Sequence, residues 1–280
     1  MRHFLLFSFC ALLPFACKHT PKDSDTGTES SQWIQLFNGK DLEGWQVKIR
    51  GYEMGDNYKN TFRVENGILK VSYEQYDRYN NEFGHLFYEK PFSYYRLRAE
   101  YRFAGEQVAG GPDWAFRNNG FMLHSQSAAG MGLDQDFPIS LEAQLLGGRD
   151  AGERPTMNLC TPGSNVVIGG DLRTEHCMNS SSKTFRGEEW ITVEMIVLGD
   201  SVIHHLVEGD TVLTYGKPTM GGGAIAGYDP EEYVEGKPMT SGHIAIQAES
   251  HPTEFRKIEL MELNEDGSPK KGGSGSGQFF

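Results

Sequence analysis

Tyr95-Arg-Leu-Arg-Ala-Glu-Tyr-Arg-Phe103 is the stretch that decides the fold class of this chain. Apolar and charged residues alternate strictly along it, with Leu97, Ala99, Tyr101 and Phe103 at the apolar positions. Successive side chains of a β-strand point to opposite faces of its sheet, so the stretch predicts a strand with one buried and one solvated face. Such alternation is typical of antiparallel sheets, because both faces of a parallel sheet are covered.

Further strand patterns lie on both sides of this stretch. Residues 61–65 and 68–72 flank Asn66-Gly67, a dipeptide that two-residue hairpin turns prefer. The other expected strands are 120–126, 139–146, 190–198, 201–207, 212–215, 243–249 and 255–263. Strands without interleaved helices predict an all-β fold. We expect a single antiparallel β-sandwich, or jelly roll, with long loops at 105–118, 147–178 and 217–237 that wall a site on one side.

The two ends of the chain carry different signals. Arg2, the apolar run 4–15 and Cys17 resemble a bacterial lipoprotein signal, in which the cysteine becomes lipid-modified; plain secretion is the alternative. We therefore expect an exported protein that is lipid-anchored in the outer membrane and faces the periplasm or the cell surface. The predicted segments are a signal peptide at 1–16, a flexible tether at 17–31, the folded domain at 32–264 and a flexible tail at 265–280.

Charge and cysteine content limit the possible partners. The formal net charge of −12 repels nucleic acid and anionic headgroups, so we expect no nucleic-acid partner and membrane contact only through the lipid anchor. Cys160 and Cys177 lie in an irregular segment of a chain that we expect to be exported. Such a pair predicts a disulfide rather than a metal site, which would need more ligands.

Four expected strands carry a row of polar side chains opposite a row of apolar ones. We predict that these rows meet in one cleft, although the solvated face of an ordinary sheet would have the same pattern. The polar residues concerned are Glu142 and Gln144, His124 and Gln126, Gln247 and Glu249, and Glu100 and Arg102.

The opening of the domain, Leu36-Phe-Asn-Gly-Lys-Asp-Leu-Glu-Gly-Trp45, resembles the 3-keto-disaccharide hydrolase family. Later stretches agree with that family in the same order along the chain: 100–103, 118–124, 138–144, 242–249 and 254–258. The resemblance covers residues 33–263 and implies a concanavalin A-like jelly roll. It also implies cleavage of glycosides whose sugar is oxidised to a ketone at ring carbon three. Asn119 stands where the family usually has serine.

A ketone at carbon three acidifies the hydrogen on carbon two, so a base can form an enolate and the oxygen on carbon one can leave. We expect Glu142 as the base and His124 as the acid. The same two residues are also candidate ligands of a divalent metal ion, which would be the cofactor. Residues expected to bind the oligosaccharide or glycoside substrate are Gln144, Gln126, Asn119, Trp114, Arg102, Glu100, Glu249, His85 and His176. Among these, Trp114 would be a platform for a pyranose ring.

Two other functions remain open at this point. A non-catalytic carbohydrate-binding lipoprotein could have the same sandwich, because folds of this class host both roles. An ordinary retaining glycosidase needs two carboxyl groups about 5–5.5 Å apart. The strand of Glu142 offers one carboxylate.

Overall fold

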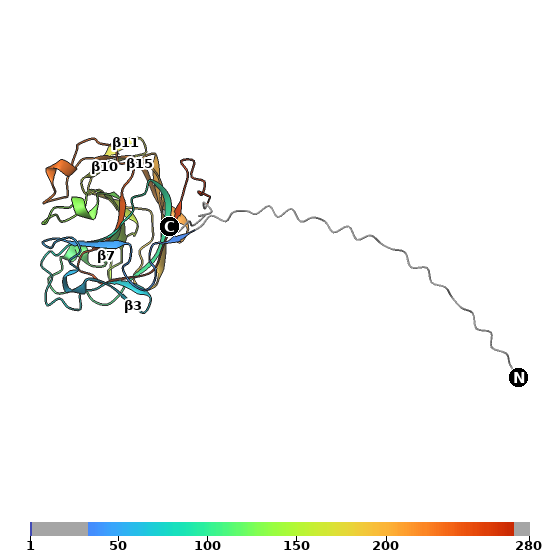
Figure 1. The fold of residues 1–280 in the computed structure, drawn as a ribbon, viewed down its shortest axis with the longest axis horizontal. Coiled ribbons are helices and arrows are strands. Elements are labelled where there is room, and N and C mark those ends of the chain that lie inside the picture. Colours follow the sequence, from blue (N-terminus) through green and yellow to red (C-terminus); the bar gives the residue numbers. More distant parts are fainter. Residues whose placement is uncertain (2–32, 272–280) are drawn as a thin grey trace, which may run out of the picture.

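Two antiparallel sheets stack as the layers of a sandwich in the computed structural model, which describes Met1 and residues 33–271 (Figure 1). The ten-stranded sheet contains, in spatial order, β11 (Asp171–Arg173), β10 (Ser164–Ile168), β15 (Asp210–Met220), β14 (Val202–Val207), β13 (Ile191–Leu198), β6 (Tyr94–Phe103), β17 (Thr253–Glu262), β4 (Ile68–Val71) and β3 (Phe62–Glu65), with β1 (Ile34–Gln35) beside β17. The seven-stranded sheet contains β12 (Cys177–Met178), β9 (Asn158–Cys160), β8 (Leu141–Leu146), β7 (Asn118–Ser125), β16 (His243–Ala248), β5 (Gly84–Tyr88) and β2 (Trp45–Ile49). The predicted all-β sandwich is confirmed.

β6 runs through the middle of the larger sheet between β13 and β17. Its apolar side chains enter the core, and Leu97, Ala99 and Tyr101 are completely buried, while the charged residues between them face outward. Burying one such large apolar side chain contributes about 1.5–3 kcal/mol, so the alternation fixes the face of the strand.

The hairpin of β3 and β4 also has the predicted form. Glu65 pairs with Ile68 across the turn. Asn66 and Gly67 both have positive φ values, 53° and 78°, which is the conformation that makes Asn-Gly favourable there.

The predicted loop at 147–178 contains four short strands. β9 and β12 extend the seven-stranded sheet, and β10 and β11 extend the ten-stranded sheet. Each has between two and five residues, which is too few for a clear alternation pattern. The remaining loops carry the 3₁₀ turns Tyr58–Asn60, Asp113–Ala115, Ala128–Gly130 and Pro230–Glu232.

The predicted signal peptide, Cys17 and the tether lie outside the described residues. At the other end of the chain, residues 264–270 form a turn in which Leu263 bridges to Pro269. Within the described part of the chain, no helix has the length and apolar character needed to cross a membrane.

Candidate active site

The outer face of the seven-stranded sheet carries a cleft with a volume of about 720 Å³. Leu141, Ala143 and Leu145 of β8 enter the core, so the residues between them point outward to the cleft. The cleft extends over β7, β8 and β9. Loops that carry Trp114, Phe137 and Ile225 form its walls. Its polar lining includes Asn118, Glu142, Gln144, Arg154, Asn158 and Glu249.

A separate apolar cluster covers the rest of this face. Phe87 and Ala245 on the sheet pack against Ala128 and Met131, with Phe137 beside them. The segment that follows β7 therefore closes the β5 side of the sheet. This explains why the cleft is confined to one half of the sheet.

Two buried carboxyl groups, those of Glu142 and Glu249, line the cleft. The residues are 5% and 3% exposed, and one oxygen of each, Oε1 of Glu142 and Oε2 of Glu249, has no hydrogen-bond partner among the described residues. Burial raises the pKa of Glu142 to about 8. The pKa of Glu249 is also raised, first by burial and then by the charge of Glu142, whereas Arg154 acts in the opposite direction. Both carboxyl groups therefore hold a proton to higher pH than an ordinary glutamate does.

Gly120 makes room for the Glu142 side chain. It lies on the neighbouring strand β7 and pairs with Gln144. A Cβ added at Gly120 would be 2.6 Å from Oε1 and 2.7 Å from Cγ of Glu142. The Glu142 side chain thus packs directly against the glycine, at a distance that leaves no room for the Cβ atom of another residue type.

Arg154 connects the wall of the cleft to its floor. Its guanidinium group donates hydrogen bonds to the carbonyl oxygens of Trp114 (2.9 Å), Gly147 (2.7 Å) and Arg117 (3.2 Å), and to that of Phe116. Burial lowers its pKa to about 10, so it remains a cation at neutral pH. Sequence reasoning missed this residue, because an arginine in an irregular loop has no periodicity that would mark it.

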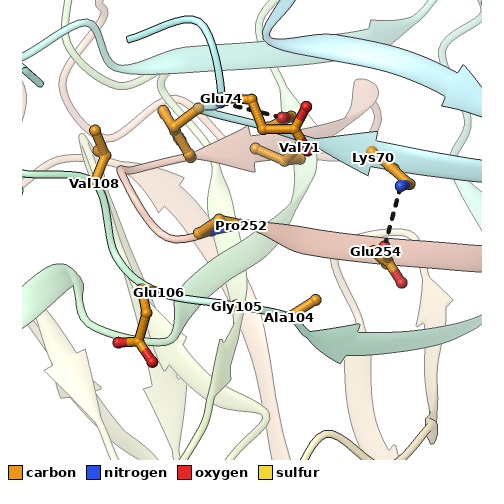
Figure 2. Close-up of a pocket in the computed structure, with 11 residues that line it drawn as sticks. Lys70, Val71, Glu74, Ala104, Gly105, Glu106, Val108, Pro252 and Glu254 are labelled. Carbon is orange, nitrogen blue, oxygen red and sulfur yellow. Dashed lines mark hydrogen bonds and ion pairs between the residues drawn. The ribbon is translucent and has the colours of Figure 1, made fainter. Parts of the chain in front are cut away.

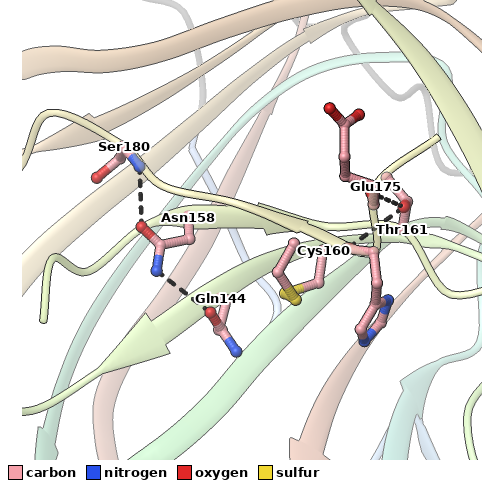
Figure 3. Close-up of a disulfide and its surroundings, with 8 residues drawn as sticks. Gln144, Asn158, Cys160, Thr161, Glu175 and Ser180 are labelled. Carbon is pink, nitrogen blue, oxygen red and sulfur yellow. Dashed lines mark hydrogen bonds between the residues drawn. A yellow bond between two sulfur atoms is a disulfide. The ribbon is translucent and has the colours of Figure 1, made fainter. Parts of the chain in front are cut away.

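The predicted disulfide between Cys160 and Cys177 is confirmed, with an S–S distance of 2.04 Å. It joins β9 to β12 at the rim of the cleft. Beside it, the backbone N–H of Ser180 donates to Oδ1 of Asn158 (2.9 Å), and Nδ2 of Asn158 donates to Oε1 of Gln144 (3.3 Å) (Figure 3).

Five of the predicted site residues line the cleft: Trp114, Glu142, Gln144, His176 and Glu249. The Trp114 residue is 50% exposed, and its ring stacks on Phe83 with a centroid distance of 6.0 Å. It therefore presents an aromatic surface to the cleft, as a platform for a sugar ring requires. His176 is exposed beside the disulfide.

His124 and Gln126 do not share the cleft with Glu142, so this part of the prediction is wrong. His124 has a φ of 48°, and the pairing of β7 with β16 shifts register close to it. The irregularity breaks the alternation, and Nε2 of His124 lies 2.9 Å from the carbonyl oxygen of Gly199. Gln126 is used within its own loop, where it donates to the carbonyl oxygen of Gly130 and accepts from the backbone N–H of Ile139.

Asn119, Glu100 and Arg102 also lie away from the cleft, contrary to the prediction. Asn119 is on the core side of β7, fully buried, and donates to the carbonyl oxygen of Gln247. Glu100 and Arg102 lie on the outer face of the ten-stranded sheet. There Glu100 pairs with Arg256 and Lys257, and Arg102 pairs with Glu254. Alternation identifies the residues that share a face, but not the sheet that their strand joins.

His85 faces the same side of the seven-stranded sheet as the cleft but does not line it. It pairs with Gln247 on β16 and is completely buried, with Phe137 in contact with its ring. Burial, with a smaller effect of Lys48, lowers its pKa to about 3, so the imidazole is neutral.

The predicted metal ligands Glu142 and His124 do not converge. Within the described residues, one group of three potential ligands comes together: Cys160, His176 and Cys177. Its two sulfur atoms are joined in the disulfide and cannot bind a metal as thiolates. The side chains present therefore do not fit the metal site that the sequence suggested.

A smaller cavity of about 360 Å³ lies at the edge of the ten-stranded sheet (Figure 2). Three of its charged groups are paired with neighbours: Nζ of Lys70 lies 3.6 Å from Glu254 and 2.9 Å from Glu65, and Glu74 pairs with Arg63. Its other charged group, Glu106, is exposed. This cavity lacks the unpartnered buried carboxyl groups that distinguish the larger cleft.

The raised pKa of Glu142 predicts a measurable pH dependence of stability. The unfolded chain releases this proton near pH 4.3 and the folded protein near pH 8, so the folded state holds more protons between these values. The free energy of unfolding should therefore fall as the pH rises through this window, by up to about 1.4 kcal/mol for each pH unit. Glu142→Gln should weaken this dependence and be more stable than the wild type at pH 9, as measured by urea unfolding at pH 5 and pH 9. Parallel curves for the two proteins would contradict the prediction.

Comparison with solved structures shows the fold. The chain is similar to a presumed glycosyl hydrolase from Parabacteroides distasonis ATCC 8503, with a TM-score of 0.50, 18% identity, and coverage of 83% of this chain and 94% of that one. A second such protein from the same organism has a TM-score of 0.49 and 15% identity, with coverage of 83% and 100%. The carbohydrate binding module CBM66 from Bacillus subtilis has a TM-score of 0.38 and 8% identity, with coverage of 81% and 92%.

No curated protein sequence matches the chain. Residues 32–261 match the 3-keto-alpha-glucoside-1,2-lyase-like domain. This match includes all the residues that line the cleft, and every strand of the sandwich apart from the last residue of β17. The function is accordingly related to carbohydrate, and the chain belongs to the 3-keto-alpha-glucoside-1,2-lyase-like family.

Proposed function

We propose that this protein cleaves 3-keto-glycosides by elimination followed by hydration. The observation that carries the proposal is the pair of buried carboxyl groups, Glu142 and Glu249, in a cleft of a size suited to a sugar. Burial raises the pKa of both groups, and the charge of Glu142 further raises that of Glu249, so that one carboxylate and one carboxylic acid can be present together. A base and an acid in one cleft are what elimination requires.

The steps balance as follows. The Glu142 carboxylate takes the hydrogen from carbon two, and the electron pair of that C–H bond forms the enolate with the oxygen on carbon three. The enolate electrons then form a double bond between carbons one and two while the glycosidic C–O bond breaks. Glu249 gives its proton to the departing oxygen. Water then adds across the double bond: Glu249 takes a proton from the water as its oxygen bonds to carbon one, and Glu142 gives a proton to carbon two. This yields the free 3-keto sugar and restores both carboxyl groups.

This assignment keeps Glu142 as the base and gives the role of the acid to Glu249 instead of His124. When Glu142 is ionised, its negative charge raises the pKa of Glu249 and so keeps the proton on that group. The exposed ring of Trp114 supports the sugar ring, as the sequence suggested.

Export and a lipid anchor at Cys17 are also part of the proposal. A disulfide between Cys160 and Cys177 supports it, because disulfides persist in oxidising compartments outside the cytoplasm. Mass spectrometry of the mature N-terminus from cells would test it, and an unmodified Cys17 within an uncleaved chain would contradict it.

Product analysis with matched substrates tests the proposed activity. The full chain is incubated in deuterium oxide with a 3-keto-disaccharide and with its unoxidised parent, each with and without a chelator. We expect cleavage of the keto form alone, with deuterium at carbon two of the recovered 3-keto sugar. Equal cleavage of the parent would instead indicate ordinary hydrolysis by the carboxyl pair. Binding of the sugar without cleavage would indicate a carbohydrate-binding protein.

A further inference from the structure

A chain of hydrogen bonds determines how the amide group of Gln144 is turned (Figure 3). The backbone N–H of Ser180 can only donate, so the atom of Asn158 that accepts from it is Oδ1. The other end of that amide, Nδ2, can also only donate, and its partner on Gln144 is Oε1. The orientation of both amides thus follows from one backbone donor whose identity is certain.

This arrangement leaves the NH₂ group of Gln144 without a partner among the described residues. Gln144 is half-buried and lines the cleft, and Figure 3 shows its nitrogen on the side away from Asn158. Gln144 lies two positions from Glu142 on β8 and on the same face of the strand, which separates their Cα atoms by about 6.6 Å. A fixed N–H donor therefore lies beside the carboxyl group that we propose as the base.

The chemistry of the substrate gives this donor a use. A sugar hydroxyl both donates and accepts, so an amide that binds it can be turned either way. A ketone oxygen, and the enolate oxygen that it becomes, only accepts. Because carbon two and carbon three are bonded, a base at the hydrogen of carbon two and a donor at the oxygen on carbon three must lie close together.

We propose that Gln144 donates a hydrogen bond from Nε2 to the oxygen on carbon three and stabilises it as the enolate forms, and that Asn158 is the positioning residue that holds Gln144 in this orientation. The inference rests on the proposed elimination and adds its missing part, a donor at the oxygen that becomes negative. The donor is neutral and fixed before the substrate binds, which is the arrangement that stabilises a developing charge most effectively.

Asn158→Asp tests the positioning role. The new carboxylate can still accept from Ser180 but has no N–H for Gln144, so Gln144 should turn its own NH₂ group toward it and its oxygen toward the cleft. We expect kcat for a 3-keto-disaccharide to fall about 10²-fold with a smaller change in KM, because loss of one such donor typically costs about 10²–10³. Gln144→Leu should have a similar effect. Asn81→Asp, which makes the same chemical change at an exposed position that does not line the cleft, is the matched control and should have the kcat of the wild type.

A spectroscopic measurement separates this inference from the proposed function. With Glu142→Gln, which blocks turnover, infrared spectroscopy of a bound 3-keto-disaccharide carrying ¹³C at the ketone reports on the carbonyl stretch. We expect a lower frequency than in water-free solvent, and loss of this shift when Asn158→Asp is added. Wild-type cleavage with the same carbonyl frequency in both variants would overturn the role of Gln144 alone. No cleavage by the wild type would overturn the proposed function, while a shift that depends on Asn158 would still establish the donor.

Discussion

Replacing Glu142 with glutamine is expected to reduce the turnover of a 3-keto-glycoside by about 10²–10⁴, the usual cost of losing a general base. Glutamine has nearly the same shape and can still form hydrogen bonds, but it cannot accept the hydrogen from carbon two. Binding should survive, because the other polar groups and Trp114 of the cleft are unchanged. Steady-state kinetics and calorimetric titration of the substrate would measure the two effects separately.

Glu100→Gln is the matched control for this variant. It makes the same chemical change on the outer face of the ten-stranded sheet, where Glu100 pairs with Arg256 and Lys257. Its turnover should equal that of the wild type. Full activity of the Glu142 variant, or an equal loss in both variants, would remove Glu142 from the mechanism.

Replacing Glu249 with glutamine is expected to have an effect that depends on the leaving group. For a 3-keto-disaccharide the departing group is a poor one, so loss of the acid should cost about 10²–10⁴ in kcat. For a 3-keto nitrophenyl glycoside the departing phenolate is already stable, and the same variant should be close to the wild type. Rates for both substrates with each enzyme would measure this difference.

The Glu142 variant serves as the internal comparison in that experiment. A base is needed whatever group departs, so it should be slow with both substrates. If Glu249→Gln lost the same factor with both substrates, Glu249 would have a role other than protonation of the departing oxygen.

Sequence alternation predicted those parts of the fold in which one side of a strand meets the core and the other meets solvent. β6 is the clearest case, and the outward pair Glu142 and Gln144 on β8 follows from the same rule. The rule fails where the parity of the strand changes. At His124 one residue with a positive φ is enough to turn the side chain away from the predicted cleft.

The pairing of Glu142 with Glu249 could not be predicted in the same way. The two residues are far apart in the chain. They line one cleft because β8 and β16 are both neighbours of β7 in the sheet. The order of strands depends on the packing of the whole sandwich and leaves no local pattern. Arg154 and Asn158 lie in a stretch of turns and short strands, where neither spacing nor periodicity marks them.

The first described residues of the folded part lie on the sheet opposite the cleft. The guanidinium carbon of Arg98 lies 4.2 Å from the centroid of the Trp33 ring, and β1 pairs with β17. The chain therefore joins the sandwich at the ten-stranded sheet. The cleft lies on the outer face of the other sheet. The point where the chain enters the sandwich therefore does not obstruct the cleft, and a substrate can approach the cleft without meeting this part of the chain.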